Sequence, residues 1–211
     1  MRGPHCLWKL LAGNASGGLA SVTMWTIPRL SGAAAAAVLL LSGCVPTTAP
    51  ATPFPTPRAT PVFASEAEAL AAATKAYAAY VRVSDEILAD GGKNPERIET
   101  VSKRDARKSA LEGFLKFRER GLASIGVSKI GPLFAQEYLP RSAGGIGVLT
   151  AYACLDVSGI DVLDSAGASV VSSARPDFQA YQLSFDFEAV KLKRFVLSVE
   201  TPWDGSGVCP E

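Results

Sequence analysis

An apolar run near the N-terminus divides the chain and limits which residues can build a core. Residues 31–42, SGAAAAAVLLLS, form the longest such run in a chain of 211 residues. The run is about a dozen residues long, whereas a membrane-spanning helix needs about 20 apolar residues. With Arg29 just before it, the run has the length and flanking charge of a signal-peptide core. We therefore expect residues 1–43 to be a signal peptide that takes no part in the fold.

The end of this run is similar to the lipobox of bacterial lipoproteins. It reads Leu41-Ser42-Gly43-Cys44. The resemblance implies cleavage between Gly43 and Cys44 and a lipid with palmitate-type acyl chains joined to the Cys44 sulfur through a thioether, with the thiolate as the nucleophile. A short buried helix that ends in a chance Gly-Cys pair is the alternative. We expect a lipoprotein anchored in the cell membrane, with its domain on the extracytoplasmic face. The signal that begins at Met24 is well proportioned, which indicates that translation starts there.

A segment rich in proline and threonine follows the cysteine. Residues 45–62 contain six Pro and five Thr. Such a segment has few backbone donors and little apolar surface to pack, so it stays extended and polyproline-like. We assign residues 44–63 to a lipidated cysteine plus tether and residues 64–211 to a single extracytoplasmic domain. A domain of roughly 150 residues buries enough surface to fold alone.

The composition of the mature chain excludes several classes of function. Loss of residues 1–43 leaves 18 basic and 20 acidic residues, and it removes His5, the only histidine. A chain without histidine has no Ser-His-Asp triad and no histidine-based metal site. The near-neutral charge gives no case for binding nucleic acid. We expect no catalytic residue, no metal and no cofactor.

The acidic residues do not form an obvious site in the sequence. Asp156, Asp161 and Asp164 are the densest group, but their spacing does not match a calcium-binding loop. Asp186 and Glu188 alternate with aromatic residues, which predicts that both are exposed. Basic residues gather in the stretch 103–120, where they form either a solvated helix face or a surface that docks on anionic lipid or cell-wall polymer.

Two cysteines remain after Cys44 is acylated and Cys6 is removed. They are Cys154 and Cys209. Outside the cytoplasm thiols oxidise readily, so we expect a disulfide between them. Two unrelated buried thiols are the alternative.

Helical patterns come first in the domain. Ser65 followed three residues later by Glu68 is a capping box, and the helix that it starts should end at Gly91-Gly92. Ser102 is a candidate cap for a later helix. The second and third helices are expected at residues 95–101 and 103–120.

Strand patterns follow the helices. Aromatic and aliphatic residues alternate with polar ones over 181–188, and Phe195, Leu197 and Val199 alternate in the last run. These two runs predict a hairpin with one buried face. Helices followed by antiparallel strands indicate an α+β fold. Further strands are expected at 125–130, 148–157, 160–163 and 168–171, whereas 134–140 is ambiguous.

Three helices followed by a curved antiparallel sheet resemble the cone-shaped nuclear-transport-factor-2-like fold. The stretches CLDVSGIDVLDSAGASV, RPDFQAYQLSF and VETPWDGSGVC are similar to those of a family of uncharacterised actinobacterial secreted proteins and lipoproteins. In that family one cysteine opens the first stretch and another lies near the C-terminus, which matches Cys154 and Cys209. The resemblance covers about residues 65–211. It implies the fold but no activity, because this fold hosts enzymes, ligand binders and assembly scaffolds.

Three hypotheses about function follow. The first is a non-enzymatic binding or envelope-assembly module with an envelope protein as partner. The second is a binder of a small apolar molecule or lipid inside the cone, with Tyr77, Phe114 and Trp203 lining the cavity. The third is an enzyme with a carboxylate in the cavity, which a strongly raised carboxylate pKa would favour. A hollow interior distinguishes the second hypothesis from the first.

Overall fold

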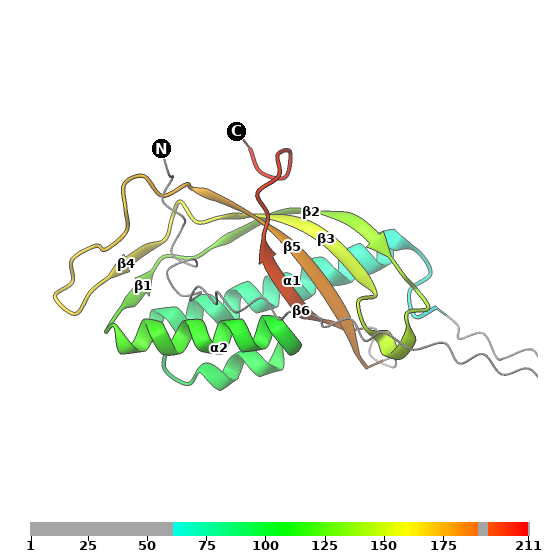
Figure 1. Ribbon diagram of the computed structural model, residues 1–211, viewed down its shortest axis with the longest axis horizontal. Coiled ribbons are helices and arrows are strands. Elements are labelled where there is room, and N and C mark those ends of the chain that lie inside the picture. The colour runs from blue at the N-terminus through cyan, green and yellow to red at the C-terminus, as the bar shows by residue number, and fades with distance from the viewer. Residues whose placement is uncertain (1–60, 190–193, 211) are drawn as a thin grey trace, which may run out of the picture. The chain divides into compact units, whose positions relative to one another are not determined.

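The computed structural model describes residues 61–189 and 194–210. The fold has the predicted α+β class, with helices first and antiparallel strands after them (Figure 1). The elements in chain order are α1 (Glu66–Ala89), η1 (Pro95–Thr100), α2 (Arg104–Glu119), β1 (Ala123–Ile125), β2 (Lys129–Tyr138), η2 (Ala143–Gly145), β3 (Leu149–Asp156), β4 (Asp161–Leu163), β5 (Phe178–Ala189) and β6 (Arg194–Pro202). The predicted second helix is a short 3-10 helix, so two α-helices precede the sheet in the described residues.

The signal peptide, the lipidated Cys44 and the tether up to residue 60 lie outside the described residues. In the part of the chain that is described, no helix combines the length and the hydropathy that a membrane crossing requires.

The capping box and the glycine pair fix the two ends of α1. The Glu68 backbone N–H donates to Ser65 Oγ at 3.2 Å, and Glu68 Oε2 accepts from the Ala64 N–H at 2.7 Å. Gly91 and Gly92 have φ values of 70° and 74°, which favour glycine. A Cβ on Gly92 would lie 2.5 Å from the Phe114 carbonyl oxygen, so glycine also permits the close approach of α1 to α2.

The start of α2 differs from the prediction. Ser102 is buried and does not cap the helix, because its hydroxyl donates to the Ile98 carbonyl at 2.8 Å. Lys103 is the N-cap residue, and its backbone N–H donates to the Leu197 carbonyl of β6 at 2.8 Å. A tertiary hydrogen bond to the sheet therefore satisfies a backbone N–H at the start of α2, where a side-chain cap was expected.

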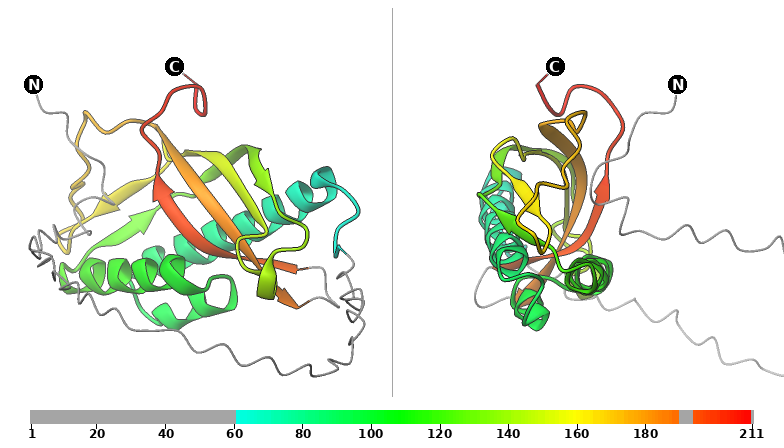
Figure 2. Two further views of the ribbon diagram at one scale, coloured as in Figure 1. Left: turned by 45° about the vertical axis from the view of Figure 1, so that its right-hand side comes forward. Right: turned by 90° about the vertical axis from the view of Figure 1, so that its left-hand side faces the viewer.

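The four-stranded sheet has the order β2-β3-β5-β6, and every neighbouring pair is antiparallel. Helices α1 and α2 lie against one face of this sheet, and β5 and β6 bend around them (Figure 2). A second small sheet pairs β1 with β4. The predicted hairpin of the last two runs is confirmed as β5 and β6.

Two of the weaker strand predictions were wrong. The strand expected at 125–130 is broken at Gly126, where φ is 90° and a Cβ would lie 1.9 Å from the Gly159 carbonyl oxygen. The chain turns there, so β1 ends at Ile125 and β2 begins at Lys129. The strand expected at 168–171 is reduced to one bridge between Leu163 and Ser169.

A β-bulge in β6 changes which residues face the helices. Leu197 lies opposite Phe185, but Val199 lies opposite Ser184, so Ser198 is one extra residue on β6. The Ser198 hydroxyl donates to the Ser184 carbonyl at 3.0 Å. Because a bulge shifts the alternation by one residue, Glu200 rather than Val199 takes the inner side of the sheet beyond this point.

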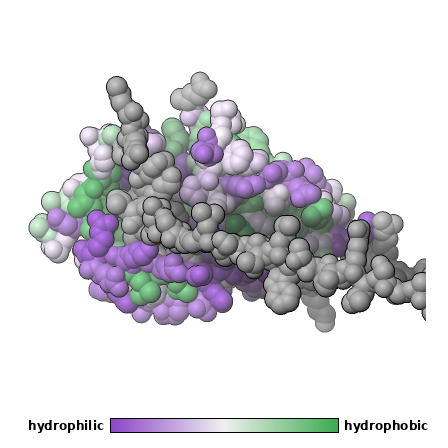
Figure 3. Space-filling view, viewed as in Figure 1, coloured by the Kyte–Doolittle hydropathy of each residue, from purple (hydrophilic) through white to green (hydrophobic). Residues whose placement is uncertain are grey.

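The main core fills the space between the helices and the sheet. The ring of Phe63 lies 5.5 Å from that of Phe187 and 4.9 Å from that of Phe195. Phe63, the last residue assigned to the tether, is thus part of the core, 2% exposed. The surface over α2 is mostly hydrophilic (Figure 3), as its many charged residues require.

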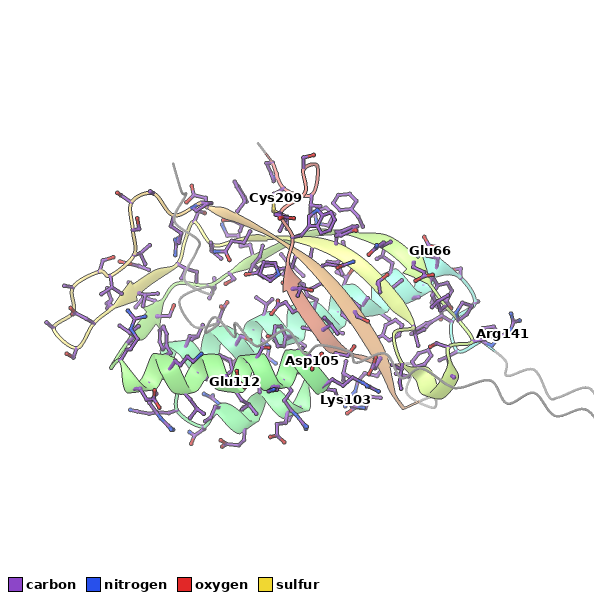
Figure 4. The ribbon with its side chains drawn as sticks, in the orientation of Figure 1. Glu66, Lys103, Asp105, Glu112, Arg141 and Cys209 are labelled. Atoms are coloured by element: carbon purple, nitrogen blue, oxygen red, sulfur yellow. A yellow bond between two sulfur atoms is a disulfide. The ribbon has the colours of Figure 1, made fainter. Side chains whose placement is uncertain are left out.

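The disulfide lies on the other face of the sheet. Cys154 of β3 and Cys209 of the C-terminal segment are joined, with 5.1 Å between their Cα atoms, as predicted. Cys209 lies beyond the sheet, on the side away from the labelled α2 residues Asp105 and Glu112 (Figure 4). The bond attaches the C-terminal segment to the middle of the sheet.

Candidate ligand-binding pocket

A cavity of about 130 Å³ lies where α1, α2 and the small β1–β4 sheet meet the inner face of the large sheet. Its wall is mostly apolar. The lining residues are Tyr80, Val81, Ser84, Asp85, Leu88, Gly113, Phe114, Phe117, Ser124, Ser128, Leu155, Val157, Ile160, Val162, Arg175, Gln179, Tyr181 and Glu200. An apolar wall with a few polar groups is the usual composition of a small-molecule site.

A carboxylate held by two tyrosines is the most distinctive polar feature of the pocket. The Tyr77 hydroxyl donates to Glu200 Oε1 and the Tyr80 hydroxyl donates to Glu200 Oε2, each at 3.0 Å. The tyrosines stand one turn apart on α1, so their rings stack with centroids 6.2 Å apart. The helix period and the β6 bulge together bring these three side chains to one point.

Burial shifts the pKa values of Glu200 and of the two tyrosines. Burial raises the pKa of Glu200 from 4.5 to about 7, although the hydrogen bonds from Tyr80 and Tyr77 act in the opposite direction. Burial and the negative charge of Glu200 likewise raise the pKa of both Tyr77 and Tyr80 well above 10. The tyrosines therefore remain neutral donors near neutral pH, while Glu200 changes its charge there.

A second carboxylate reaches the pocket from α1. Asp85 accepts hydrogen bonds from the Ser128 backbone N–H at 2.8 Å and from the Ser128 hydroxyl at 2.9 Å. Burial raises the pKa of Asp85, and the two Ser128 hydrogen bonds lower it. These contacts connect α1 to the turn between β1 and β2, so Asp85 also has a structural role.

The pocket contains one cationic side chain among its lining residues, Arg175. Its Nη2 atom donates to the carbonyls of Val157 and Ile160, both at 2.8 Å. The guanidinium group is therefore used to hold the chain between β3 and β4, and no ion pair joins it to Glu200 within the described ranges.

The structure places the three predicted lining residues differently. Phe114 lines the pocket and is 2% exposed. Tyr77 is not in the wall but is fully buried behind it, where it holds Glu200. Trp203 is not among the lining residues; it is 36% exposed, with its ring 4.8 Å from that of Tyr152 on the outer face of the sheet.

The acidic residues considered in the sequence lie elsewhere. Asp186 is 4% exposed, so the prediction that it is exposed was wrong. It accepts from Arg104 Nε at 2.7 Å and from the Gly147 N–H at 2.8 Å, and thereby joins α2 to the loop before β3.

Glu188 is partly buried and pairs with Arg194. Among the residues that the structure describes, no three acidic or sulfur-bearing side chains gather in a group that could hold a metal.

Four residues of the site were not predicted from the sequence: Glu200, Tyr80, Asp85 and Arg175. Tyr80 carried a signal, because it follows Tyr77 at helical spacing on the buried side of α1. The other three carried none. Glu200 stands at a position that strand alternation assigns to the outer face, and only the bulge at Ser198 turns it inward.

Comparisons with known proteins add little to this geometry. No protein-family model matches the chain, and no curated protein matches it either. One solved structure that is similar is the solution structure of a de novo designed β-sheet protein, which has 10% sequence identity and covers 69% of this chain and 95% of its own, with a TM-score of 0.30. A likeness at that level carries no argument about function.

Proposed function

We propose that the chain is a membrane-anchored extracytoplasmic lipoprotein whose domain is a non-enzymatic binding module for a small molecule. The observation that carries the proposal is the apolar pocket of about 130 Å³ with Glu200 in its wall. An engineered cavity of about 150 Å³ in another protein accepts benzene, so a pocket of this size suits a compact molecule rather than a long lipid chain.

The arrangement of the elements supports a finer description of the fold. Two α-helices against the inner face of a bent antiparallel sheet fit the nuclear-transport-factor-2-like cone. In such a cone the pocket is its hollow interior. A domain with a filled interior would instead have favoured the envelope-assembly module, which docks other proteins on its outside.

An enzyme is the second candidate, and one observation favours it. A carboxylate with a pKa of about 7 is suited to general acid–base work near neutral pH. Each oxygen of Glu200 also accepts a hydrogen bond from a tyrosine, which orients the carboxylate in the pocket wall. Turnover of a substrate by the purified chain, lost in Glu200→Gln, would favour the enzyme.

Filling the pocket should abolish binding without unfolding the chain. We expect benzyl alcohol to produce saturable shifts in the NMR methyl signals of Val81, Leu155 and Val162, which line the pocket. Ser84→Leu adds an apolar side chain to the same wall and should remove these shifts. Ala67→Leu on the exposed side of the first turn of α1 is the matched control and should keep them. Methyl signals that do not respond in the wild-type chain would contradict the proposal.

A further inference from the structure

The charges in the pocket do not balance. Glu200 and Asp85 contribute two carboxylates to the wall, and Arg175 contributes a single cation. Asp85 is satisfied by the backbone and hydroxyl donors of Ser128. Arg175 donates from Nη2 to two backbone carbonyls, while its buried Nε has no partner in the described part of the chain. Glu200 is left with neutral donors alone among the described residues, because only tyrosine hydroxyls are bonded to it.

The Glu200 carboxylate keeps capacity for a further partner. An ionised carboxylate has about four acceptor positions. The two tyrosines occupy two of them, one on each oxygen. A carboxylate in an apolar wall is strongly stabilised by a cation with N–H donors, since attraction between opposite charges is greater where water is excluded.

The walls of the pocket suit the same kind of ligand. Tyr80, Tyr181, Phe114 and Phe117 all line it. The face of an aromatic ring attracts a cation that approaches it, and the same ring gives apolar contact to a hydrocarbon group. The pocket therefore combines the carboxylate of Glu200 with aromatic surfaces.

We infer that the pocket takes a small organic ammonium ion of about eight non-hydrogen atoms, whose nitrogen binds Glu200 and whose hydrocarbon part contacts the aromatic wall. This inference rests on the proposed function and specifies the class of its ligand. A neutral molecule of the same shape would lack the charge that attracts the cation to Glu200.

The groups that face Glu200 determine how pH affects such binding. Tyr77 and Tyr80 face it from α1, and Tyr181 stands on β5 two residues before Leu183, which lies opposite Glu200. Helix α2 contributes only Gly113, Phe114 and Phe117 to this pocket, none of which titrates. Asp85 and Arg175 share the wall. Since the pKa values of Tyr77 and Tyr80 are raised well above 10 and that of Glu200 is about 7, Glu200 is the group expected to change its charge between pH 6 and pH 8.

Benzylamine and benzyl alcohol test the inference, because they have the same number of non-hydrogen atoms and differ in charge. With the purified chain, calorimetry should show that benzylamine binds at least tenfold more tightly than benzyl alcohol at pH 8. Its affinity should fall about tenfold at pH 6, where a carboxyl of pKa about 7 is mostly protonated. Affinity for benzyl alcohol should not fall on acidification.

Two variants complete the test. Glu200→Gln keeps the shape of the side chain and removes its charge, so it should lose the preference for benzylamine and still bind benzyl alcohol. Glu137→Gln, which makes the same change at an exposed position of β2, should behave as the wild type. If Glu200→Gln does not fold, the release of protons on binding tests the inference with the wild-type chain. At pH 6.5 benzylamine should bind the ionised form of Glu200 and release protons, and the measured heat of binding should then depend on the buffer.

The outcomes separate the two proposals. Equal affinity for both molecules, or no proton release, would overturn the ammonium inference while leaving a binding pocket in place. Binding of neither molecule would overturn both. Preference for benzoate would overturn the inference and assign the pocket to anions, through Arg175.

Discussion

The folded domain should lose stability as the pH rises from about 5 to 8. Glu200 has a pKa of about 7 in the folded chain, against 4.5 for an unperturbed glutamate. Between these values the folded state binds more protons than the unfolded state, so the free energy of unfolding falls as the pH increases. The full shift corresponds to at most about 3 kcal/mol. Asp85, whose pKa is also raised, acts in the same direction.

Urea denaturation at a series of pH values measures this effect, and a variant assigns it. Glu200→Gln should flatten the profile over this range and should be more stable than the wild type at pH 8. Glu137→Gln, at an exposed position, should keep the wild-type slope. The pKa of Asp156 is lowered by its hydrogen bonds to Ser158, so its contribution lies below pH 4, outside the window. A wild-type stability that is constant or rises between pH 5 and pH 8 would contradict the buried position of Glu200.

Removal of the disulfide should cost about 3 kcal/mol of folding free energy. The bond joins residues 55 apart, and a closed loop of this length restricts the unfolded chain strongly. Cys154→Ala combined with Cys209→Ala should show the loss in urea denaturation. A thiol reductant should destabilise the wild type by a similar amount and leave the double variant unchanged.

The same double variant should keep the pocket. The disulfide and the pocket lie on opposite faces of the large sheet, since Cys154 is not among the pocket residues and Glu200, which is in the pocket wall, is on the inner side. Under conditions where the double variant is folded, it should therefore bind benzyl alcohol as the wild type does. A stability loss below about 1 kcal/mol, or loss of binding by folded protein, would show that the cross-link has a different role.

Local signals predicted the elements of the fold well. The Ser65–Glu68 box, the Gly91-Gly92 stop and the alternation in β5 are governed by residues close in sequence, and the structure agrees with each. The cysteine pairing followed from counting thiols in an oxidising compartment. The start of α2 was missed because its first free N–H finds the Leu197 carbonyl, a partner about 90 residues away.

The pocket was harder to predict, because it depends on long-range features. One extra residue in β6 reverses the alternation and turns Glu200 inward, and no residue type in that strand marks the bulge. Asp186 is buried for a different reason. Its position in an alternating strand predicts exposure, yet Arg104 and the Gly147 N–H cover it. Apolar periodicity locates a buried face but does not tell a filled core from a cavity wall.

The mass of the native protein, purified gently from the membranes of cells that express it, tests the central claim most directly. We expect the mass of acylated Cys44–Glu211 less two hydrogens, plus an additional small mass that leaves on denaturation and is absent from Ser84→Leu. A native mass without any such addition would contradict the binding function, and a mass that begins before Cys44 would contradict the lipid anchor.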